Sequence, residues 1–300
     1  MKSSSWNKLK TTKILAVCAT FIAILGCGGT ISSPVSSPNF PQFGHVILVV
    51  EENHGYSEVI GGTAMPYLKS LASKYGLATQ YFANAHPSLP NYFMMTTGQI
   101  ISLDDGFTGT VDADNLVREL VNAGKTWKSY AESIPSTGYV GGDVFPYKKG
   151  HNPFAYMTDV LNSNAQMQNL VSLSQFNTDV SANQLPNFSF VVPNLLNDAH
   201  DGSLQVADQW LQNNIAPLIS SSSFQNNGLL IILFDEANFD DLTNGGGHVA
   251  AVIVSPKAKS GHQSTTLYQH QSTLRLILEG LGVRKFPGAA NAAPEMGEFF

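Results

Sequence analysis

Two apolar runs in this chain, residues 46–50 and 229–234, each end directly in a pair of acidic residues. Glu51 and Glu52 follow the first run, and Asp235 and Glu236 follow the second. Short runs of Val, Ile, Leu and Phe without alternation are typical of strands buried on both faces of a parallel sheet. Open α/β sheets bind their ligands beyond the carboxyl ends of such strands. The two runs therefore predict an α/β fold with an acidic site at one edge of its sheet.

Further strand-like runs alternate with helical patterns along the chain, which predicts a mostly parallel central sheet between two helical layers, a three-layer α/β/α sandwich. The predicted strands cover residues 46–50, 77–82, 126–131, 188–192, 229–234 and 249–254. The predicted helices cover residues 64–75, 91–97, 113–122, 203–219 and 270–281. Residues 138–184 lack a clear periodicity, and we interpret them as a cover that sets substrate specificity.

The first 42 residues have the composition of an export signal followed by a tether. Four lysines and no acid precede a stretch of apolar and small residues at 14–26, which is too short to span a bilayer, so residues 1–26 are predicted to be a signal peptide. The stretch ends Ile24-Leu25-Gly26-Cys27 and resembles a bacterial lipobox, which predicts a lipid on Cys27 and anchoring at the outer side of the cell envelope. An ordinary secretory signal is the alternative. Residues 27–42 then form a Ser/Pro-rich tether, and residues 43–300 form the folded domain.

Cysteine content and charge exclude two classes of function. Cys18 lies within the predicted signal and Cys27 carries the predicted lipid, so the mature chain has no thiol for catalysis. Loss of the signal removes four lysines and no acid, which changes the net charge from −6 to about −10. A surface of this sign repels a phosphate backbone, so nucleic acid is not an expected partner.

Ser88 lies in the segment His86-Pro87-Ser88-Leu89-Pro90. Pro90 suits the first position of a helix, which would place Ser88 at a helix N-terminus, where backbone N–H groups stabilise a phosphate or a serine alkoxide. A simple helix cap is the alternative interpretation.

Three further clusters follow or precede predicted strands. Asp198-Ala199-His200-Asp201 offers a histidine flanked by carboxylates, suited to metal ligation or proton transfer. Asp235 and Glu236 would repel each other unless a cation lay between them. Gly245-Gly246-Gly247-His248 places a histidine at a strand start. The remaining histidines have no partner at suggestive spacing and are interpreted as surface or capping residues, with His54 and His151 as the expected exceptions; they are His45, His54, His151, His262 and His270.

Together these motifs resemble the bacterial phosphoesterase family of acid phosphatases and phospholipase C enzymes, within the alkaline-phosphatase-like superfamily. The resemblance extends from about His45 to Leu281. The motifs that carry it are Glu52-Asn53-His54-Gly55-Tyr56, His86-Pro87-Ser88-Leu89-Pro90-Asn91-Tyr92, Pro193-Asn194 with Asn197-Asp198-Ala199-His200-Asp201-Gly202, and Asp235-Glu236 with Gly246-Gly247-His248.

The resemblance implies a metal-dependent phosphoric ester hydrolase in which Ser88 forms a phosphoserine intermediate. The implied metal ligands are Glu52, Asn53, Ser88, Asp235 and Glu236. The residues implied to bind the phosphoryl group are Asn53, His86, His200 and His248, and His86 or His200 is the candidate proton donor. An oxygen-rich ligand set leaves Mg, Ca, Mn and Fe open.

The segment after Glu236 lacks the glycine-rich aromatic stretch associated with the phospholipase C branch, which favours an acid-phosphatase-like phosphomonoesterase. A phospholipase C that cleaves phospholipid head groups is the alternative, and a non-catalytic, lipid-anchored binding protein is the alternative of another class. The physiological substrate, the metal, the pH optimum and the oligomeric state are left open.

Overall fold

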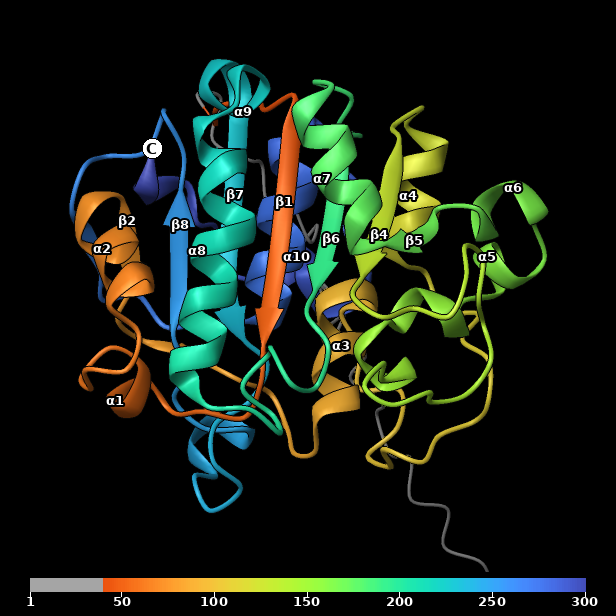
Figure 1. The fold of residues 1–300 in the computed structure, drawn as a ribbon, viewed down its shortest axis with the longest axis horizontal. Helices are drawn as coiled ribbons and strands as arrows, with labels where there is room; N and C mark the ends of the chain where they lie inside the picture. The colour runs from red at the N-terminus through yellow and green to blue at the C-terminus, as the bar shows by residue number, and fades with distance from the viewer. Residues whose placement is uncertain (1–39) are drawn as a thin grey trace, which may run out of the picture. The chain divides into compact units, whose positions relative to one another are not determined.

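The computed structural model describes residues 40–300, so the predicted signal peptide, Cys27 and nearly all of the predicted tether lie outside the described residues. A central sheet of eight strands has the order β5-β4-β6-β1-β7-β8-β2-β9 (Figure 1). Its strands are β1 (His45–Glu51), β2 (Gly76–Ala78), β4 (Trp127–Ala131), β5 (Leu170–Ser172), β6 (Phe188–Val192), β7 (Gly228–Phe234), β8 (Ala251–Val254) and β9 (His262–Ser264). Only β8 runs antiparallel to its neighbours, so the predicted mostly parallel sheet is confirmed.

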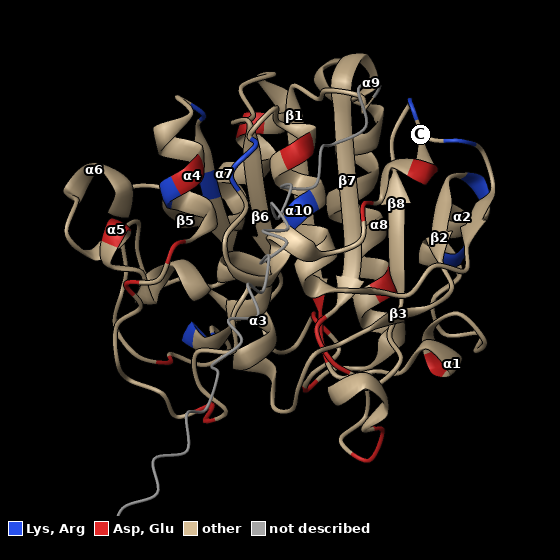
Figure 2. Cartoon of the chain, turned by 180° about the vertical axis from the view of Figure 1, so that it is seen from behind, with Lys and Arg blue, Asp and Glu red and all other residues tan. Residues whose placement is uncertain are grey.

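Helices cover both faces of this sheet, which confirms the predicted three-layer sandwich. Helices α2, α7 and α8 pack together on one face, and α3, α4 and α10 pack together on the other (Figures 1 and 2). The α-helices are α1 (Tyr56–Val59), α2 (Pro66–Lys74), α3 (Ser88–Thr97), α4 (Leu116–Asn122), α5 (Thr158–Leu161), α6 (Asn164–Met167), α7 (Leu173–Ser181), α8 (Leu204–Ser220), α9 (Ser222–Asn227) and α10 (His270–Gly280). Within residues 40–300, no helix combines the length and the apolar character that crossing a bilayer requires.

The two central strands are buried along their whole length apart from His45 at the first position of β1, which is half-buried. Strand β1 pairs in parallel with β6 on one side and with β7 on the other, so it has no exposed edge. A strand enclosed in this way can only end in polar side chains where the sheet itself ends. The acidic residues that follow β1 and β7 therefore emerge side by side at the carboxyl ends of the strands.

Two predicted elements differ in the structure. Residues 77–82 are not one strand: Thr79 and Gln80 form a turn, after which β3 (Tyr81–Phe82) leaves the main sheet and pairs with β10 (Tyr268–Gln269). The helix predicted at 91–97 begins at Ser88 instead, so Pro90 is its third residue. Proline is tolerated there because the first N–H groups of a helix have no partner within the helix.

The segment of unclear periodicity, residues 138–184, contains several short elements. In addition to α5, α6, β5 and α7, it contains the 3₁₀-helices η1 (Lys149–His151) and η2 (Pro153–Tyr156). These two turns pack against α3, the helix that begins at Ser88. The segment thus reaches the edge of the sheet where the acidic residues lie. The other 3₁₀-helices are η3 (Thr243–Gly245), η4 (Gly288–Ala292) and η5 (Gly297–Phe299).

Candidate functional site

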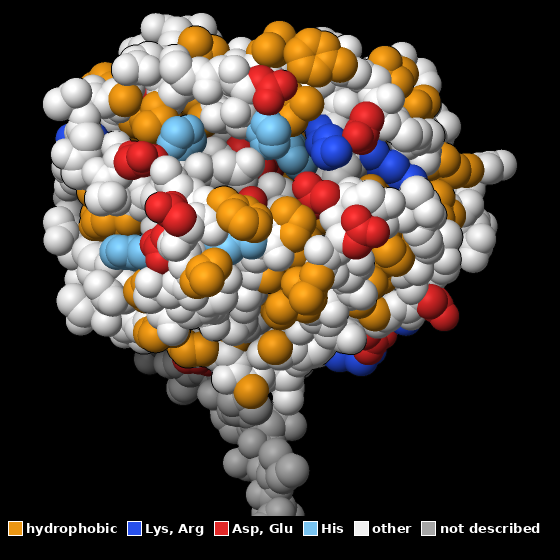
Figure 3. Space-filling model, turned by 90° about the horizontal axis from the view of Figure 1, so that it is seen from below, with side chains coloured by type: hydrophobic (Ala, Val, Ile, Leu, Met, Phe, Trp, Pro, Cys, Tyr) orange, Lys and Arg blue, Asp and Glu red, His pale blue; other side chains and the backbone are white. Residues whose placement is uncertain are grey.

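The carboxyl ends of three neighbouring strands are joined by backbone hydrogen bonds that continue past the sheet. The N–H of Glu52, just beyond β1, donates to the carbonyl of Asp198 (2.8 Å), and the N–H of Asp235, just beyond β7, donates to the carbonyl of Glu51 (3.0 Å). Figure 3 views the molecule from this end and shows histidine and acidic side chains gathered on the face. The sequence clusters after β1, β6 and β7 are therefore in one site, as their positions at strand ends predicted.

Ser88 is the first residue of α3 and is almost fully buried. Its Oγ lies 3.0 Å from Oε2 of Glu52 and 3.4 Å from Oε1 of Glu236. The side-chain amide of Asn53 lies 3.3 Å from the same Oγ. The Ser88 hydroxyl is thus surrounded by two carboxylates and an amide that come from two other segments of the chain, residues 52–53 and residue 236.

The side-chain amide of Asn53 has two possible orientations in this site. With its oxygen toward the carboxylates, it faces only acceptors, whereas with its nitrogen toward them it donates to Glu236 Oε1 (3.0 Å) and Glu52 Oε2 (3.3 Å). The first orientation is favourable only with a cation among these oxygens, and the second satisfies the same groups without one. The fit to a divalent cation rests instead on the type of ligand, since the carboxylate, hydroxyl and amide oxygens gathered here are the hard oxygen ligands that such ions prefer.

The buried carboxyl groups of this site raise one another's pKa. Burial, followed by the charges of Asp235 and Asp198, raises the pKa of Glu52 well above its usual value. Burial and the charge of Glu236 raise the pKa of Asp235, and burial raises the pKa of Glu236 to about 8. Four carboxylates cannot all be ionised in so small a buried volume without compensating positive charge. A bound cation would supply it.

Glu52, His151 and Asp198 form a second group of candidate ligands. One ligand atom from each of these buried side chains lies within 4.8 Å of the other two. His151 Nε2 is 3.4 Å from Glu52 Oε1, and His151 Nδ1 is 3.3 Å from Asp198 Oδ2. Among the described residues, Asp198 Oδ2 and Asp235 Oδ2 have no hydrogen-bond partner, as expected for carboxylates arranged to bind an ion. Glu52 belongs to both groups.

Tyr92, one helical turn after Ser88, fixes the shared carboxylate. Its hydroxyl donates to Glu52 Oε1, while its ring stacks on His151 at 5.2 Å with an interplanar angle of 7°. The tyrosine is completely buried, and burial together with the charge of Glu52 raises its pKa well above the usual value. It therefore stays protonated and acts as a donor to Glu52.

His86 is tied at both ring nitrogens. Nδ1 lies 2.7 Å from Glu236 Oε2, and Nε2 lies 2.9 Å from the carbonyl oxygen of Asp241. Because a carbonyl only accepts, Nε2 carries the hydrogen that Asp241 receives, and Nδ1 is engaged by the Glu236 carboxyl group. The structure thus places His86 behind Glu236 with neither nitrogen free for a substrate.

His200 lies at the rim of the site, with 37% of its side chain exposed. Its Nδ1 is 2.7 Å from Asp201 Oδ1, and its backbone N–H donates to Asp198 Oδ1 (2.9 Å). Its ring centre is 5.9 Å from that of His151. Within the motif Asp198-Ala199-His200-Asp201, the side chain of Asp198 is therefore buried in the site, whereas that of His200 is exposed to solvent at its rim.

His248 is held between two aromatic rings. It stacks on Tyr56 at 4.3 Å and on Phe82 at 4.8 Å, and its Nε2 lies 3.0 Å from the carbonyl of Thr79. Its backbone N–H donates to Asp241 Oδ2 (3.0 Å), so its link to the site runs through Asp241 to His86. The contacts of its ring are with this aromatic layer, and not with the carboxylates around Ser88.

Two residues central to this geometry were not assigned by the sequence motifs. The sequence patterns give His151 no partner and mark it only as one of two expected exceptions among the lone histidines. In the motif Asp198-Ala199-His200-Asp201 they assign the role to His200 and not to Asp198. The sequence signal for His151 is its position in the irregular segment that was expected to cover the site. His54, the other expected exception, pairs on the surface with Glu58 at 2.8 Å.

The sequence of the chain is similar to those of known phosphatases. The sequence model of the Phosphoesterase family matches residues 62–284. A phosphatidylinositol-3-phosphatase of Mycobacterium tuberculosis is 29% identical over 284 residues, which cover 94% of this chain and 91% of that protein. A probable acid phosphatase of Kluyveromyces lactis is 27% identical over 90% of this chain, but the matched region is 65% of that protein's length.

The fold has counterparts among solved structures. A Vibrio parahaemolyticus protein of the alkaline phosphatase superfamily aligns with a TM-score of 0.59 at 14% identity, covering 84% of this chain and 72% of that one. The lipoteichoic acid synthase LtaP from Listeria monocytogenes aligns with the same TM-score at 12% identity, covering 84% of this chain and 76% of that one. At these identities the likeness concerns the fold alone.

Proposed function

The chain belongs to the phosphoesterase family, and from this premise we propose that it is a metal-dependent, acid-phosphatase-like hydrolase of phosphate monoesters that acts through a phosphoserine at Ser88. One observation carries the proposal. The Ser88 hydroxyl is buried at the start of a helix with Glu52, Asn53 and Glu236 within 3.4 Å. A serine needs a proton acceptor and compensating positive charge to become a nucleophile, and this arrangement offers the first directly.

In the proposed reaction, Ser88 Oγ attacks phosphorus and its proton passes to Glu52 Oε2, 3.0 Å away. The bond from phosphorus to the ester oxygen breaks, and the leaving alkoxide takes a proton from His200. Among the described residues, His200 Nε2 has no partner, while Nδ1 is oriented by Asp201. In the second step a water oxygen attacks the phosphorus of the phosphoserine and its proton passes to His200. The bond from phosphorus to Ser88 Oγ breaks, Ser88 Oγ takes its proton back from Glu52, and inorganic phosphate leaves. His86 holds Glu236 in place and does not donate to the substrate.

A divalent cation would be held by Glu52, Asn53, Ser88, Asp235 and Glu236, with the neighbouring Glu52, His151 and Asp198 group as a further place for an ion. When bound, the ion stabilises the serine alkoxide and the charge on the phosphoryl oxygens. Mg, Ca, Mn and Fe all accept oxygen-rich ligand sets, and a histidine in the second group favours Mn or Fe there.

The test is hydrolysis of 4-nitrophenyl phosphate by Ser88→Ala. We expect turnover to fall by at least about a thousandfold while the circular dichroism spectrum is unchanged. Ser272→Ala is the matched control, because Ser272 is a fully buried helical serine whose hydroxyl has no partner among the described residues. A Ser88→Ala variant as active as wild type removes serine from the mechanism. Absence of both bound metal and hydrolysis across a broad ester panel would favour the non-catalytic binding protein instead.

A phospholipid substrate is the second candidate, supported by apolar side chains on loops that carry site residues. Phe145, Phe239 and Leu242 are 66%, 76% and 68% exposed, and the ring of Phe239 lies 5.3 Å from that of His86. The product identifies the reaction: a phosphatase acting on a lipid phosphate releases inorganic phosphate, whereas a phospholipase C releases a phosphorylated head group. Loss of activity on vesicles, but not on soluble esters, in Phe239→Ser would support a lipid-facing role.

We further propose that the protein is exported and anchored to the cell envelope through a lipid on Cys27. The support is the lipobox-like sequence and the Ser/Pro-rich stretch after it. Membrane fractionation of Cys27→Ser tests this proposal. We expect the variant in the soluble fraction and wild type in the membrane fraction, and equal partitioning of the two would refute lipidation.

A further inference from the structure

A pocket of about 310 Å³ lies beside the start of α3 and has no role in the steps above. Phe107, Val140 and Tyr156 give it an apolar lining, and Asp105, Asp143 and Lys149 contribute its charges. Such a mixture of apolar walls and a few placed polar groups is characteristic of sites for small molecules.

Two contacts link the lining of this pocket to residues of the candidate active site. Asp105 Oδ1 accepts the N–H of Leu89 (3.0 Å), the residue directly after Ser88. Lys149 and His151 are the two ends of η1, and His151 Nε2 is 3.4 Å from Glu52 Oε1. The lining of the pocket is thus connected to the residue that follows Ser88 and to the 3₁₀-helix that carries His151.

The charged groups of the pocket differ in whether they are already paired. Asp143 Oδ2 forms an ion pair with Lys148 Nζ (2.9 Å), and Asp143 Oδ1 accepts the backbone N–H of Lys149 (2.8 Å). Asp105 accepts the Leu89 N–H. The Lys149 ammonium instead lies 4.3 Å from the centre of the Tyr156 ring, and no ion pair of the described residues includes it.

We propose that this pocket receives the leaving group of the phosphate ester and that Lys149 binds a second anionic group, a carboxylate or another phosphate, on that leaving group. The inference rests on the proposed function and specifies its substrate class. A cationic leaving group such as choline is disfavoured, because the Tyr156 face that would bind a quaternary ammonium already holds the Lys149 ammonium.

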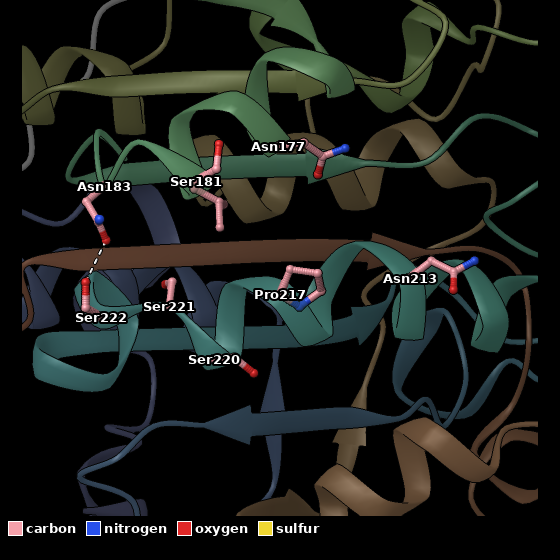
Figure 4. A pocket seen from close by; sticks show the side chains of 9 residues that line it. Asn177, Ser181, Asn183, Asn213, Pro217, Ser220, Ser221 and Ser222 are labelled. Carbon is pink, nitrogen blue, oxygen red and sulfur yellow. Dashed lines mark hydrogen bonds between the residues drawn. The ribbon is translucent and has the colours of Figure 1, made fainter.

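Another pocket, of about 400 Å³, lies between α7, α8 and the start of α9 (Figure 4). Its polar lining is entirely neutral and consists of asparagine and serine side chains, with Ser222 donating to Asn183 (2.8 Å). It offers no charge by which to select a ligand class, and it therefore carries no comparable inference.

The experiment compares two esters whose leaving alcohols differ at one carbon, which is a carboxylate in 3-phosphoglycerate and an uncharged hydroxymethyl group in glycerol 3-phosphate. The measured quantity is kcat/KM for 3-phosphoglycerate divided by kcat/KM for glycerol 3-phosphate. We expect Lys149→Met to lower this ratio by about tenfold and Lys149→Arg to keep most of it. Lys148→Met is the matched control. It also removes one lysine charge, but the Lys148 ammonium is already paired with Asp143, so the ratio should not change.

Equal loss of the ratio in Lys148→Met and Lys149→Met would overturn the proposal, since it would indicate general electrostatic attraction. A wild-type preference for phosphocholine over both esters would also overturn it. If wild type hydrolyses 4-nitrophenyl phosphate but neither of these two esters, the proposed function stands and the pocket is tested by calorimetry; if it hydrolyses none of the three, the proposed function is in question and calorimetry still tests the pocket. In either case, 3-phosphoglycerate should bind to Ser88→Ala and bind about tenfold more weakly to Ser88→Ala with Lys149→Met, and equal binding by the two would refute the pocket.

Discussion

Ser88 Oγ lies 3.0 Å from Glu52 Oε2, although the two residues are 36 positions apart in the chain. The contact joins the first turn of α3 to the carboxyl end of β1. Glu52 also receives the hydroxyl of Tyr92 and lies within 3.4 Å of His151, so one carboxylate connects the nucleophile to both groups of candidate metal ligands.

We therefore predict that Glu52→Gln lowers kcat/KM for 4-nitrophenyl phosphate by at least about a hundredfold, because the amide can neither accept the Ser88 proton nor compensate a cation. In the presence of a chelator its melting temperature should be close to that of wild type, since a buried carboxyl of raised pKa is replaced by a neutral group of the same shape. Near wild-type activity would contradict the assignment of Glu52.

Removal of the metal should reduce both activity and stability. A cation that binds only the folded state adds about 2.7 kcal/mol at a concentration a hundred times its Kd, which thermal unfolding with and without a chelator would detect. Asp198→Asn should lower the metal content measured by atomic spectroscopy. Asp179→Asn is the control, because Asp179 is a similarly buried carboxylate that pairs with Lys128 instead. Equal metal content in wild type and Asp198→Asn would exclude Asp198 as a ligand.

The proposed proton donor can be identified by its dependence on the leaving group. His200→Gln should slow hydrolysis of alkyl phosphates by about a hundredfold and that of 4-nitrophenyl phosphate only a few fold, because 4-nitrophenolate leaves without protonation. His86→Gln should slow both substrates equally, since both nitrogens of His86 are engaged by Glu236 and Asp241. If His86→Gln shows the selective loss instead, the two roles are reversed.

His270 should make the fold sensitive to acid. It is fully buried at the start of α10, its Nε2 lies 2.6 Å from the carbonyl of Asp235, and burial lowers its pKa to about 4. In the unfolded chain the pKa is about 6.5, so between pH 6.5 and 4 the unfolded state binds a proton that the folded state does not. Stability present above pH 6.5 should therefore fall by about 3 kcal/mol as the pH decreases through this window.

Urea unfolding of wild type and His270→Gln at pH 7 and pH 4.5 checks this prediction. Glutamine retains a donor for the Asp235 carbonyl but does not titrate, so the variant should lose less stability between the two pH values. An equally steep loss in both proteins would show that other groups account for the acid sensitivity.

The sequence by itself determined the fold class and the edge of the sheet where the site lies. Residues 46–50 and 229–234 are so uniformly apolar that they can only be enclosed strands, and their acidic ends can only emerge where a sheet ends. The proline-rich start of α3 likewise marked Ser88 as a residue at a helix N-terminus, although the helix begins two residues before Pro90. The enclosed strands and the helix start depend on residues that are close together in the chain, so the sequence pattern of a short segment is enough to predict them.

Only the tertiary structure decided which histidines and carboxylates share the site. His151 lies 3.4 Å from Glu52 because η1 packs against α3, and the irregular segment that carries η1 has no period from which this packing could be predicted. His200 and Asp198 are two residues apart, yet one faces solvent and the other is buried, and Ala199 between them has φ of 74°. Such directions depend on long-range packing and on single backbone angles, which short-range sequence patterns do not encode.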